Sequence, residues 1–178
     1  MMQIRPIRNK THTKLFLYVI CMLLLTLTFT ACGTKLESGY VDDLNYKDNV
    51  VELVGLADEN IEVSITELAE LECINKDYST TNTYGSKVTH YAYGPLLTTL
   101  IKSKGREIGD FTKIRFIAAD GYFVDLEGDM LKKKSVLSFR EGPDDPLKGE
   151  GIPLRLIVPK ESSAMWVEGI IKIEFISE

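Results

Sequence analysis

Two apolar stretches rich in β-branched residues dominate the C-terminal part of the chain. They span residues 151–159 and 165–175, and the polar segment 160–163 separates them. Runs of this length and composition are typical of buried or half-buried strands. Pro153 and Pro159 favour strand ends, because proline cannot donate a hydrogen bond to a ladder. The pattern therefore predicts two strands joined by a short turn.

Shorter apolar segments between polar turns predict the other strands. Asp120-Gly121 lies between two alternating runs and favours a type I′ hairpin turn, in which both central residues have positive φ. A predicted strand at 72–74 leads into a polar stretch at 75–83, and residues 140–149 predict a solvated loop. The other predicted strands cover residues 50–55, 61–64, 84–93, 113–118, 122–126 and 136–139.

Two short helices are predicted among these strands. For residues 64–71, Ser64 or Thr66 can provide the cap, and acidic side chains in the first turns favour the positive end of the helix dipole. The second helix is predicted to begin at Pro95, since proline is favoured at the first helical position. Its apolar face is formed by Leu96, Leu97, Leu100 and Ile101. Short strands with two modest helices indicate an α+β domain.

The first 31 residues have the composition of a secretory leader. The apolar run at 15–29 is shorter than the roughly 20 residues that a membrane-spanning helix needs. It follows a positive region without acidic residues, formed by Arg5, Arg8, Lys10 and Lys14. Thr30-Ala31-Cys32-Gly33 resembles the lipobox at which bacterial lipoproteins are cleaved and lipidated, with Phe29 in place of the usual leucine.

This leader predicts the organisation of the chain. We expect a signal peptide at 1–31, a lipidated tether at 32–49 that begins at Cys32, and one domain at 50–178. The alternative is an uncleaved N-terminal anchor helix. Both alternatives predict a membrane-attached protein on the extracytoplasmic face of the cell membrane.

Charge and cysteine content exclude several classes of function. The chain carries 21 basic and 26 acidic residues, and removal of the four basic leader residues leaves 17 against 26, a net charge of −9. Such a domain has no electrostatic footprint for nucleic acid, so membrane attachment must come from acyl chains on Cys32. After processing, Cys73 is the single remaining thiol, which excludes an intramolecular disulfide and a cysteine-rich zinc site.

The order of several motifs resembles the sulfite-oxidase-like molybdopterin-binding domain family. The resemblance covers residues 61–175 and is carried by Gly151-x-Pro-Leu-Arg-Leu-x-x-Pro159 with Trp166-Val167 after it. Tyr91-x-Gly-x-x-Leu96 and Asp120-Gly-Tyr122 precede this block in the expected order. The resemblance implies an α+β fold of mixed sheets with a few short helices.

The resemblance also implies candidate site residues. In active members of the family one cysteine thiolate ligates molybdenum, and Cys73 falls near that position. Arg155 matches the arginine that lies near the pterin phosphate. From the residues alone, Cys73 can equally be a buried structural residue and Arg155 a partly buried partner of a carboxylate. His90 is expected on an exposed strand face without a catalytic role.

Three departures count against a tightly held anionic cofactor. Residues 74–76 do not match the segment that follows the ligand cysteine, and the glycines usual after Pro159 are absent. Glu168 stands where active enzymes have a basic residue, and its carboxylate would repel a phosphate.

We therefore predict a binding module without a cofactor, which takes a small molecule or an extracytoplasmic partner. The alternative is a molybdenum–molybdopterin oxidoreductase that catalyses oxygen-atom or electron transfer, with Cys73 as metal ligand and a redox partner. A purely structural envelope protein is a third possibility.

Overall fold

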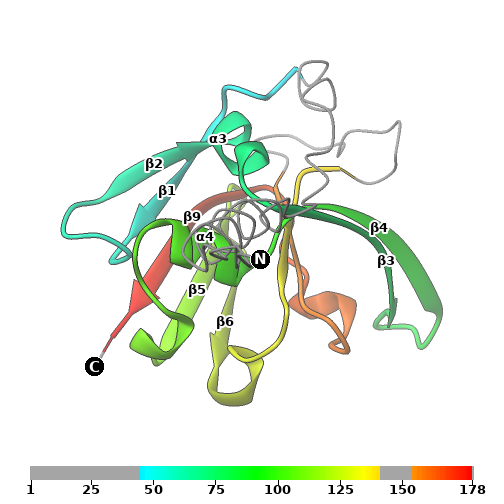
Figure 1. Cartoon of the computed structure of the whole chain (residues 1–178). Helices are drawn as coiled ribbons and strands as arrows, with labels where there is room; N and C mark the ends of the chain where they lie inside the picture. The colour runs from blue at the N-terminus through cyan, green and yellow to red at the C-terminus, as the bar shows by residue number, and fades with distance from the viewer. Residues whose placement is uncertain (1–44, 141–153, 178) are drawn as a thin grey trace, which may run out of the picture. The chain divides into compact units, whose positions relative to one another are not determined.

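The computed structural model describes residues 45–140 and 154–177 (Figure 1). This part of the chain is built from short strands and a few short helices, as an α+β domain requires. The strands are β1 (Val50–Val54), β2 (Ile61–Ser64), β3 (Cys73–Thr81), β4 (Lys87–Pro95), β5 (Lys113–Ala118), β6 (Phe123–Glu127), β7 (Val136–Ser138), β8 (Arg155–Ile157) and β9 (Ile170–Ile176). The helices are α3 (Ile65–Glu70) and α4 (Leu97–Ser103), with 3-10 turns η1 (Ile108–Asp110), η2 (Gly128–Met130) and η3 (Ser163–Met165).

The largest sheet in the described residues has the strand order β2-β1-β9-β5-β6 (Figure 1). Strand β9 lies at its centre, parallel to β1 and antiparallel to β5. The last strand of the chain therefore joins two hairpins, β1–β2 and β5–β6, into one sheet. The strand pairs β3–β4 and β7–β8 form separate two-stranded sheets.

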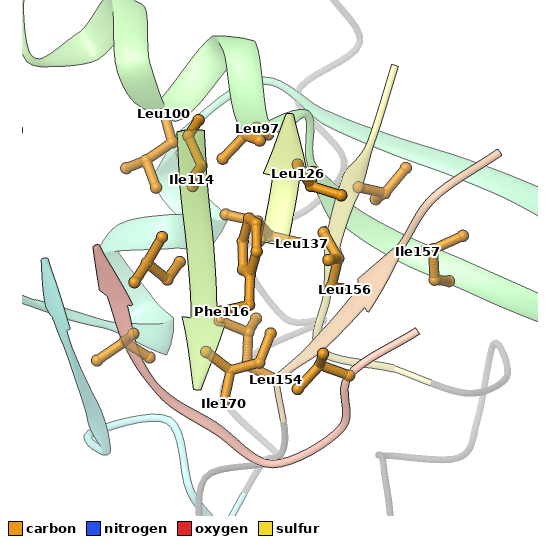
Figure 2. Packing of buried hydrophobic residues seen from close by; sticks show 14 of the residues in the cluster. Leu97, Leu100, Ile114, Phe116, Leu126, Leu137, Leu154, Leu156, Ile157 and Ile170 are labelled. Atoms are coloured by element: carbon orange, nitrogen blue, oxygen red, sulfur yellow. The ribbon is translucent and has the colours of Figure 1, made fainter. Parts of the chain in front are cut away.

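The hydrophobic core lies between this sheet, α4 and the β7–β8 pair. Strand β5 alternates between buried and half-buried residues, which is the pattern of a strand with one face on the core. Figure 2 shows Leu97 and Leu100 of α4 in one cluster with Ile114 and Phe116 of β5 and with Leu156 of β8. The apolar face predicted for the second helix is confirmed for Leu97, Leu100 and Ile101, which are buried, whereas Leu96 precedes the helix and is half-buried.

Helix α3 begins with a capping box, which decides between the two predicted caps. The backbone N–H of Glu67 donates to Ser64 Oγ at 3.1 Å, and Ser64 N–H donates to Glu67 Oε2 at 2.7 Å. The bond from the Ser64 N–H, together with one from the Ser64 hydroxyl at 2.9 Å, stabilises the Glu67 carboxylate and lowers its pKa. Thr66 instead donates its hydroxyl to the carbonyl of Lys47. Ser64 is therefore the cap.

Part of the segment predicted as a tether packs against the domain. Tyr46 donates its hydroxyl to the carbonyl oxygen of Phe139 at 2.6 Å, and the backbone N–H of Ile65 donates to the carbonyl of Asn49 at 3.1 Å. Ordered contacts therefore begin before residue 50. The leader at 1–31 and residues 32–44 of the tether lie outside the described residues. Within the described residues, no helix is long and apolar enough to cross a membrane.

The polar stretch after Cys73 is a strand, so the predicted strand at 72–74 was too short. Strand β3 continues to Thr81 and pairs with β4 along its whole length. In Figure 1 this β3–β4 hairpin curves away from the main sheet, which leaves most of β3 without a core to cover. Polar side chains such as Ser79 and Thr89, whose hydroxyls lie 2.8 Å apart, therefore replace the apolar alternation by which a strand is recognised.

The sequence predicts that the second helix begins at Pro95, and this prediction is wrong. Pro95 is the last residue of β4 and pairs with Cys73, whereas α4 begins at Leu97. The preceding residue, Leu96, forms a β-bridge with Val136. Pairing with β3 therefore extends β4 two residues beyond its predicted end at residue 93, and the helix begins correspondingly later.

The β5–β6 turn is not of type I′. Gly121 has a φ of 85°, but Asp120 has no positive φ. Gly121 N–H donates to the carbonyl of Ala118 at 3.0 Å, and Asp120 Oδ1 accepts from the N–H of Tyr122 at 2.8 Å. This pattern is a type I turn followed by a glycine in the left-handed region, the other common way to close a hairpin.

The two C-terminal apolar runs contain shorter strands than predicted, and they meet in a short antiparallel segment at the bridge between Arg155 and Glu168. Strand β8 pairs with β7. Met165, at the start of the second run, belongs to the 3-10 turn η3, and β9 begins at Ile170. The sequence predicts Arg140 in a solvated loop, but the residue forms a β-bridge with Tyr93 and is only 2% exposed. Residues 141–149 of that loop lie outside the described residues.

The attachment of the β3–β4 hairpin depends on Gly94. A Cβ at this position would lie 1.9 Å from the carbonyl oxygen of Leu137, a contact with backbone that no rotamer relieves. We expect Gly94→Ala to lower the free energy of unfolding by about 3 kcal/mol, measured by urea denaturation. Gly109→Ala is the control, because nothing lies within 4 Å of its Cβ position, and it should change stability by less than about 0.5 kcal/mol. Equal effects of the two substitutions would contradict the prediction.

Candidate functional site

Arg155 pairs with a carboxylate of its own chain. Its Nη2 donates to Glu168 Oε2 at 2.7 Å, and its side chain is 8% exposed against 41% for Glu168. The two residues face each other across an antiparallel β-bridge, next to the hydrogen bond from Leu156 N–H to the Val167 carbonyl at 2.7 Å. Backbone register therefore brings the Glu168 carboxylate to Arg155. This contact is the one expected for a partly buried arginine that pairs with an acid.

His90 and Trp166 complete this arginine cluster, which consists of Arg155, Glu168, His90 and Trp166. Arg155 Nη1 lies 3.2 Å from His90 Nδ1. Because a guanidinium only donates, Nδ1 is the acceptor in a hydrogen bond between these two atoms. The ring of His90 packs edge-on to Trp166 at 5.3 Å, and Trp166 Nε1 donates to the Val158 carbonyl at 3.0 Å. His90 is therefore half-buried, not exposed as expected from the sequence.

Cys73 occupies a different environment. It is the first residue of β3, half-buried, and packed against the hydrophobic core. Its Sγ lies 3.8 Å from the carbonyl oxygen of Leu68 and 3.9 Å from that of Ala69. Burial raises the pKa of the Cys73 thiol to about 12, so the group is a neutral thiol at pH 7.

The structure does not bring Cys73 into contact with the arginine cluster. Tyr78 is paired with His90 and Cys73 with Pro95 along the β3–β4 ladder. Cys73 therefore lies five residues along β3 from Tyr78, the residue opposite His90, a distance of roughly 17 Å. Among the described residues there is no group of three or more His, Cys, Asp or Glu side chains that could hold a metal ion.

The two candidate residues do not fit the molybdopterin that the resemblance of the sequence implies. A metal would need the Cys73 thiolate, but this sulfur is surrounded by apolar residues and backbone carbonyls that favour the neutral thiol. A phosphate at Arg155 would meet the Glu168 carboxylate, which is already bound there at 2.7 Å. Both roles inferred from the resemblance remain predictions that the local chemistry does not favour.

A second candidate site was not anticipated from the sequence. A polar cleft of about 280 Å³ lies between the end of β3 and the turn after β8. Its lining residues are Ser79, Thr80, Thr81, Lys160, Glu161 and Ser162. Thr80 donates its hydroxyl to the Glu161 carbonyl, and Lys133 pairs with the Glu161 carboxylate. In the sequence, this cleft corresponds to two short segments with hydroxyl side chains, at 79–81 and 160–162. Such segments are common in turns and do not by themselves indicate a site.

Neither a family model nor a curated protein sequence matches the chain. A solved structure does match, the sulfane dehydrogenase SoxCD from Paracoccus pantotrophus, with a TM-score of 0.63 and 15% sequence identity. The match covers 76% of this chain and 40% of that chain, so the protein spans less than half of the matched structure. This likeness confirms the fold predicted from the sequence, a sulfite-oxidase-like α+β arrangement of mixed sheets. At this identity it shows the fold alone.

Removal of Arg155 should destabilise the protein in the absence of any ligand, because its side chain holds Glu168 and His90 together. We expect Arg155→Met to lower the free energy of unfolding by about 2 kcal/mol, less than for a fully buried ion pair because Glu168 is partly exposed. Arg106→Met is the control, since Arg106 and Asp110 form an exposed pair whose attraction is largely screened by solvent. A loss at Arg155 no larger than that at Arg106, measured by chemical denaturation, would contradict the structural role.

The Cys73 thiol should react slowly in the folded protein. At pH 8 a pKa of about 12 leaves very little thiolate, and the thiolate is the nucleophile. We expect alkylation of Cys73 by iodoacetamide to be at least roughly 100-fold slower in the folded chain than in urea, followed by mass spectrometry of the Cys73 peptide. Rates within about tenfold of each other would show that the sulfur is exposed as a thiolate.

Proposed function

We propose that the protein is a lipid-anchored, extracytoplasmic binding module that uses a sulfite-oxidase-like fold without a molybdenum cofactor. The observation that supports this most is the contact between Arg155 and Glu168 at 2.7 Å. The residue that would steady a pterin phosphate has an internal anion as its partner.

Competition with Glu168 makes this position unfavourable for an anionic cofactor. A phosphate would have to displace a carboxylate that the β-bridge holds opposite Arg155, and the displaced charge would stay nearby. In a partly buried site, two anions beside one guanidinium repel each other strongly. The Nδ1 atom of His90 lies 3.2 Å from Arg155 Nη1, so this nitrogen faces the same guanidinium.

The membrane location in this proposal rests on the N-terminal sequence. The basic region, the apolar run and the small residues before Cys32 support export and lipidation. Acyl chains on Cys32 would hold an acidic domain at a surface that its own charge does not favour. The domain would then meet a small molecule or a partner protein outside the cytoplasm.

The alternative function is that of a molybdenum-dependent oxidoreductase, which the fold likeness to a sulfane dehydrogenase supports. In that case Cys73 would bind the metal as a thiolate, and Arg155 would lie beside the pterin phosphate. The cofactor would supply the oxygen-atom or electron-transfer chemistry. Cys73 would first have to lose its proton against the effect of burial.

Metal analysis separates these two functions. The full chain is produced in a host that synthesises the molybdenum cofactor and purified in mild detergent, beside the variant Cys73→Ser. We expect less than about 0.05 molybdenum or pterin per chain in both proteins, because neither candidate residue offers a fitting ligand. The measurements are elemental mass spectrometry and fluorescence of the oxidised pterin.

A control is needed to show that the host delivers the cofactor. A known molybdoenzyme produced in the same cells should be fully loaded. Near-stoichiometric molybdenum in the parent chain that disappears in Cys73→Ser would overturn the proposed function and establish the oxidoreductase.

A further inference from the structure

We propose that the polar cleft between β3 and the turn after β8 binds a compact oxyanion, such as a phosphate, sulfate or sulfonate group, through Lys160. This inference names a ligand class for the proposed binding function and rests on that function. Three independent features of the cleft support it: the chemistry of its lining, its local charge and the backbone conformation of Lys160.

The lining of the cleft suits a small polar ligand. All six lining residues are polar, and four of them carry hydroxyl groups, namely Ser79, Thr80, Thr81 and Ser162. The Thr80 hydroxyl already donates to the Glu161 carbonyl and the Ser79 hydroxyl is paired with Thr89, so the donors that an anion can meet are the Lys160 ammonium and the hydroxyls of Thr81 and Ser162. The volume of about 280 Å³ is at the small end of ligand sites, which commonly reach several hundred Å³ and are mainly apolar. An apolar or drug-sized ligand would therefore bury little surface here, whereas a small oxyanion can accept hydrogen bonds from these remaining donors.

The local charge favours an anion over a cation. Glu161 is the only acid in the lining, and its carboxylate pairs with Lys133. Lys160 is exposed and forms no ion pair within the described part of the chain. The cleft with Lys133 therefore carries one net positive charge on a chain whose overall charge is −5. An anion can bind Lys160 without competing with an internal carboxylate, unlike at Arg155.

The backbone at Lys160 is in a conformation that lysine disfavours. Its φ is 67°, the one positive value at a non-glycine position among the described residues. Glycine adopts this region without steric cost, so the side chain at this position brings strain with it. Residues held in such conformations occur preferentially at binding and catalytic sites. The strain therefore points to a use for the side chain.

The turn that carries Lys160 is held rigidly against β3. Glu161 N–H donates to the Val158 carbonyl at 3.3 Å and closes the turn. The Glu161 carbonyl accepts from the Thr80 hydroxyl, and its carboxylate pairs with Lys133. These contacts fix the backbone on both sides of the cleft before a ligand arrives, which lowers the entropic cost of binding.

The test is a titration of the full, isotope-labelled chain in mild detergent, with ionic strength kept constant by sodium chloride. Inorganic phosphate, inorganic sulfate, methyl phosphate and methanesulfonate are added separately, and backbone amide shifts are followed by NMR. We expect saturable shifts at residues 79–81 and 160–162 with at least one of these anions. Tighter binding of methyl phosphate or methanesulfonate than of the inorganic ions would assign the site to organic anions, and the reverse order to inorganic ones.

Two variants and a matched control identify the ligand residue. Lys160→Gln removes the ammonium, and Lys160→Gly removes it while suiting a φ of 67°. We expect each to weaken binding about tenfold or more, as for the loss of a charge-assisted hydrogen bond. Lys104→Gln removes the same charge at the end of α4 and should leave the affinity unchanged. Because Lys160→Gly relieves backbone strain, its melting temperature should not fall, so weaker binding cannot be ascribed to misfolding.

Two results would overturn the inference. One is the absence of saturable binding by all four anions, and the other is unchanged affinity in both Lys160 variants. Either result would refute anion binding by the cleft without changing the conclusion from the molybdenum measurement. Conversely, stoichiometric molybdenum would remove the proposed cofactor-free function, while the anion titration of the same preparation would still report on Lys160.

Discussion

The close backbone contact at Gly94 is the constraint on which the rest of the structure depends. Strand β4 passes β7 so closely that only a residue without a side chain fits opposite Leu137. On one side of this contact Phe139 N–H donates to the Tyr93 carbonyl at 3.0 Å, and on the other Leu97 N–H donates to the Ser135 carbonyl at 2.9 Å. The β3–β4 hairpin is thereby joined to the β7–β8 pair. His90 reaches Arg155, and the end of β3 reaches the turn at 160–162, because this junction sets the direction of the hairpin.

Once the hairpin is placed, register decides which charges meet. The β-bridge between Arg155 and Glu168 fixes a carboxylate opposite the guanidinium, so little side-chain entropy is lost when the pair forms. That distinguishes it from an exposed pair such as Arg106 and Asp110, where the entropy of the side chains offsets most of the attraction. A nearly buried arginine needs such a partner, since an uncompensated charge in this position would be strongly unfavourable. The same pairing reduces the capacity of Arg155 to bind an external anion.

Local signals predicted the elements that depend on local physics. Strand β2 and the buried face of α4 followed from alternation and helical period, and capping chemistry limited the cap of α3 to Ser64 or Thr66. Elements set by tertiary contacts were missed. Pro95 stays in a strand because β3 and β7 pair with its segment, and the polar part of β3 is a strand because β4 runs beside it. A partly buried arginine paired with a carboxylate was one of the alternatives for Arg155, but the sequence did not identify Glu168 as the partner. The cleft also needed the fold, because residues 79–81 and 160–162 are far apart in sequence.

The hairpin explains why binding and stability are hard to separate in this fold. A two-stranded ribbon is marginal in water, so β3–β4 must be held by contacts along its length. The contacts that hold it are the junction at Gly94, the approach of His90 to Arg155, and the hydrogen bond from Thr80 to the turn after β8. The polar groups that could receive a ligand are thus mostly engaged in supporting the hairpin. Lys160 differs from them, because its ammonium contributes no ion pair to the described structure while its backbone lies in a conformation that favours glycine. At this residue a role in binding can be distinguished from a role in folding.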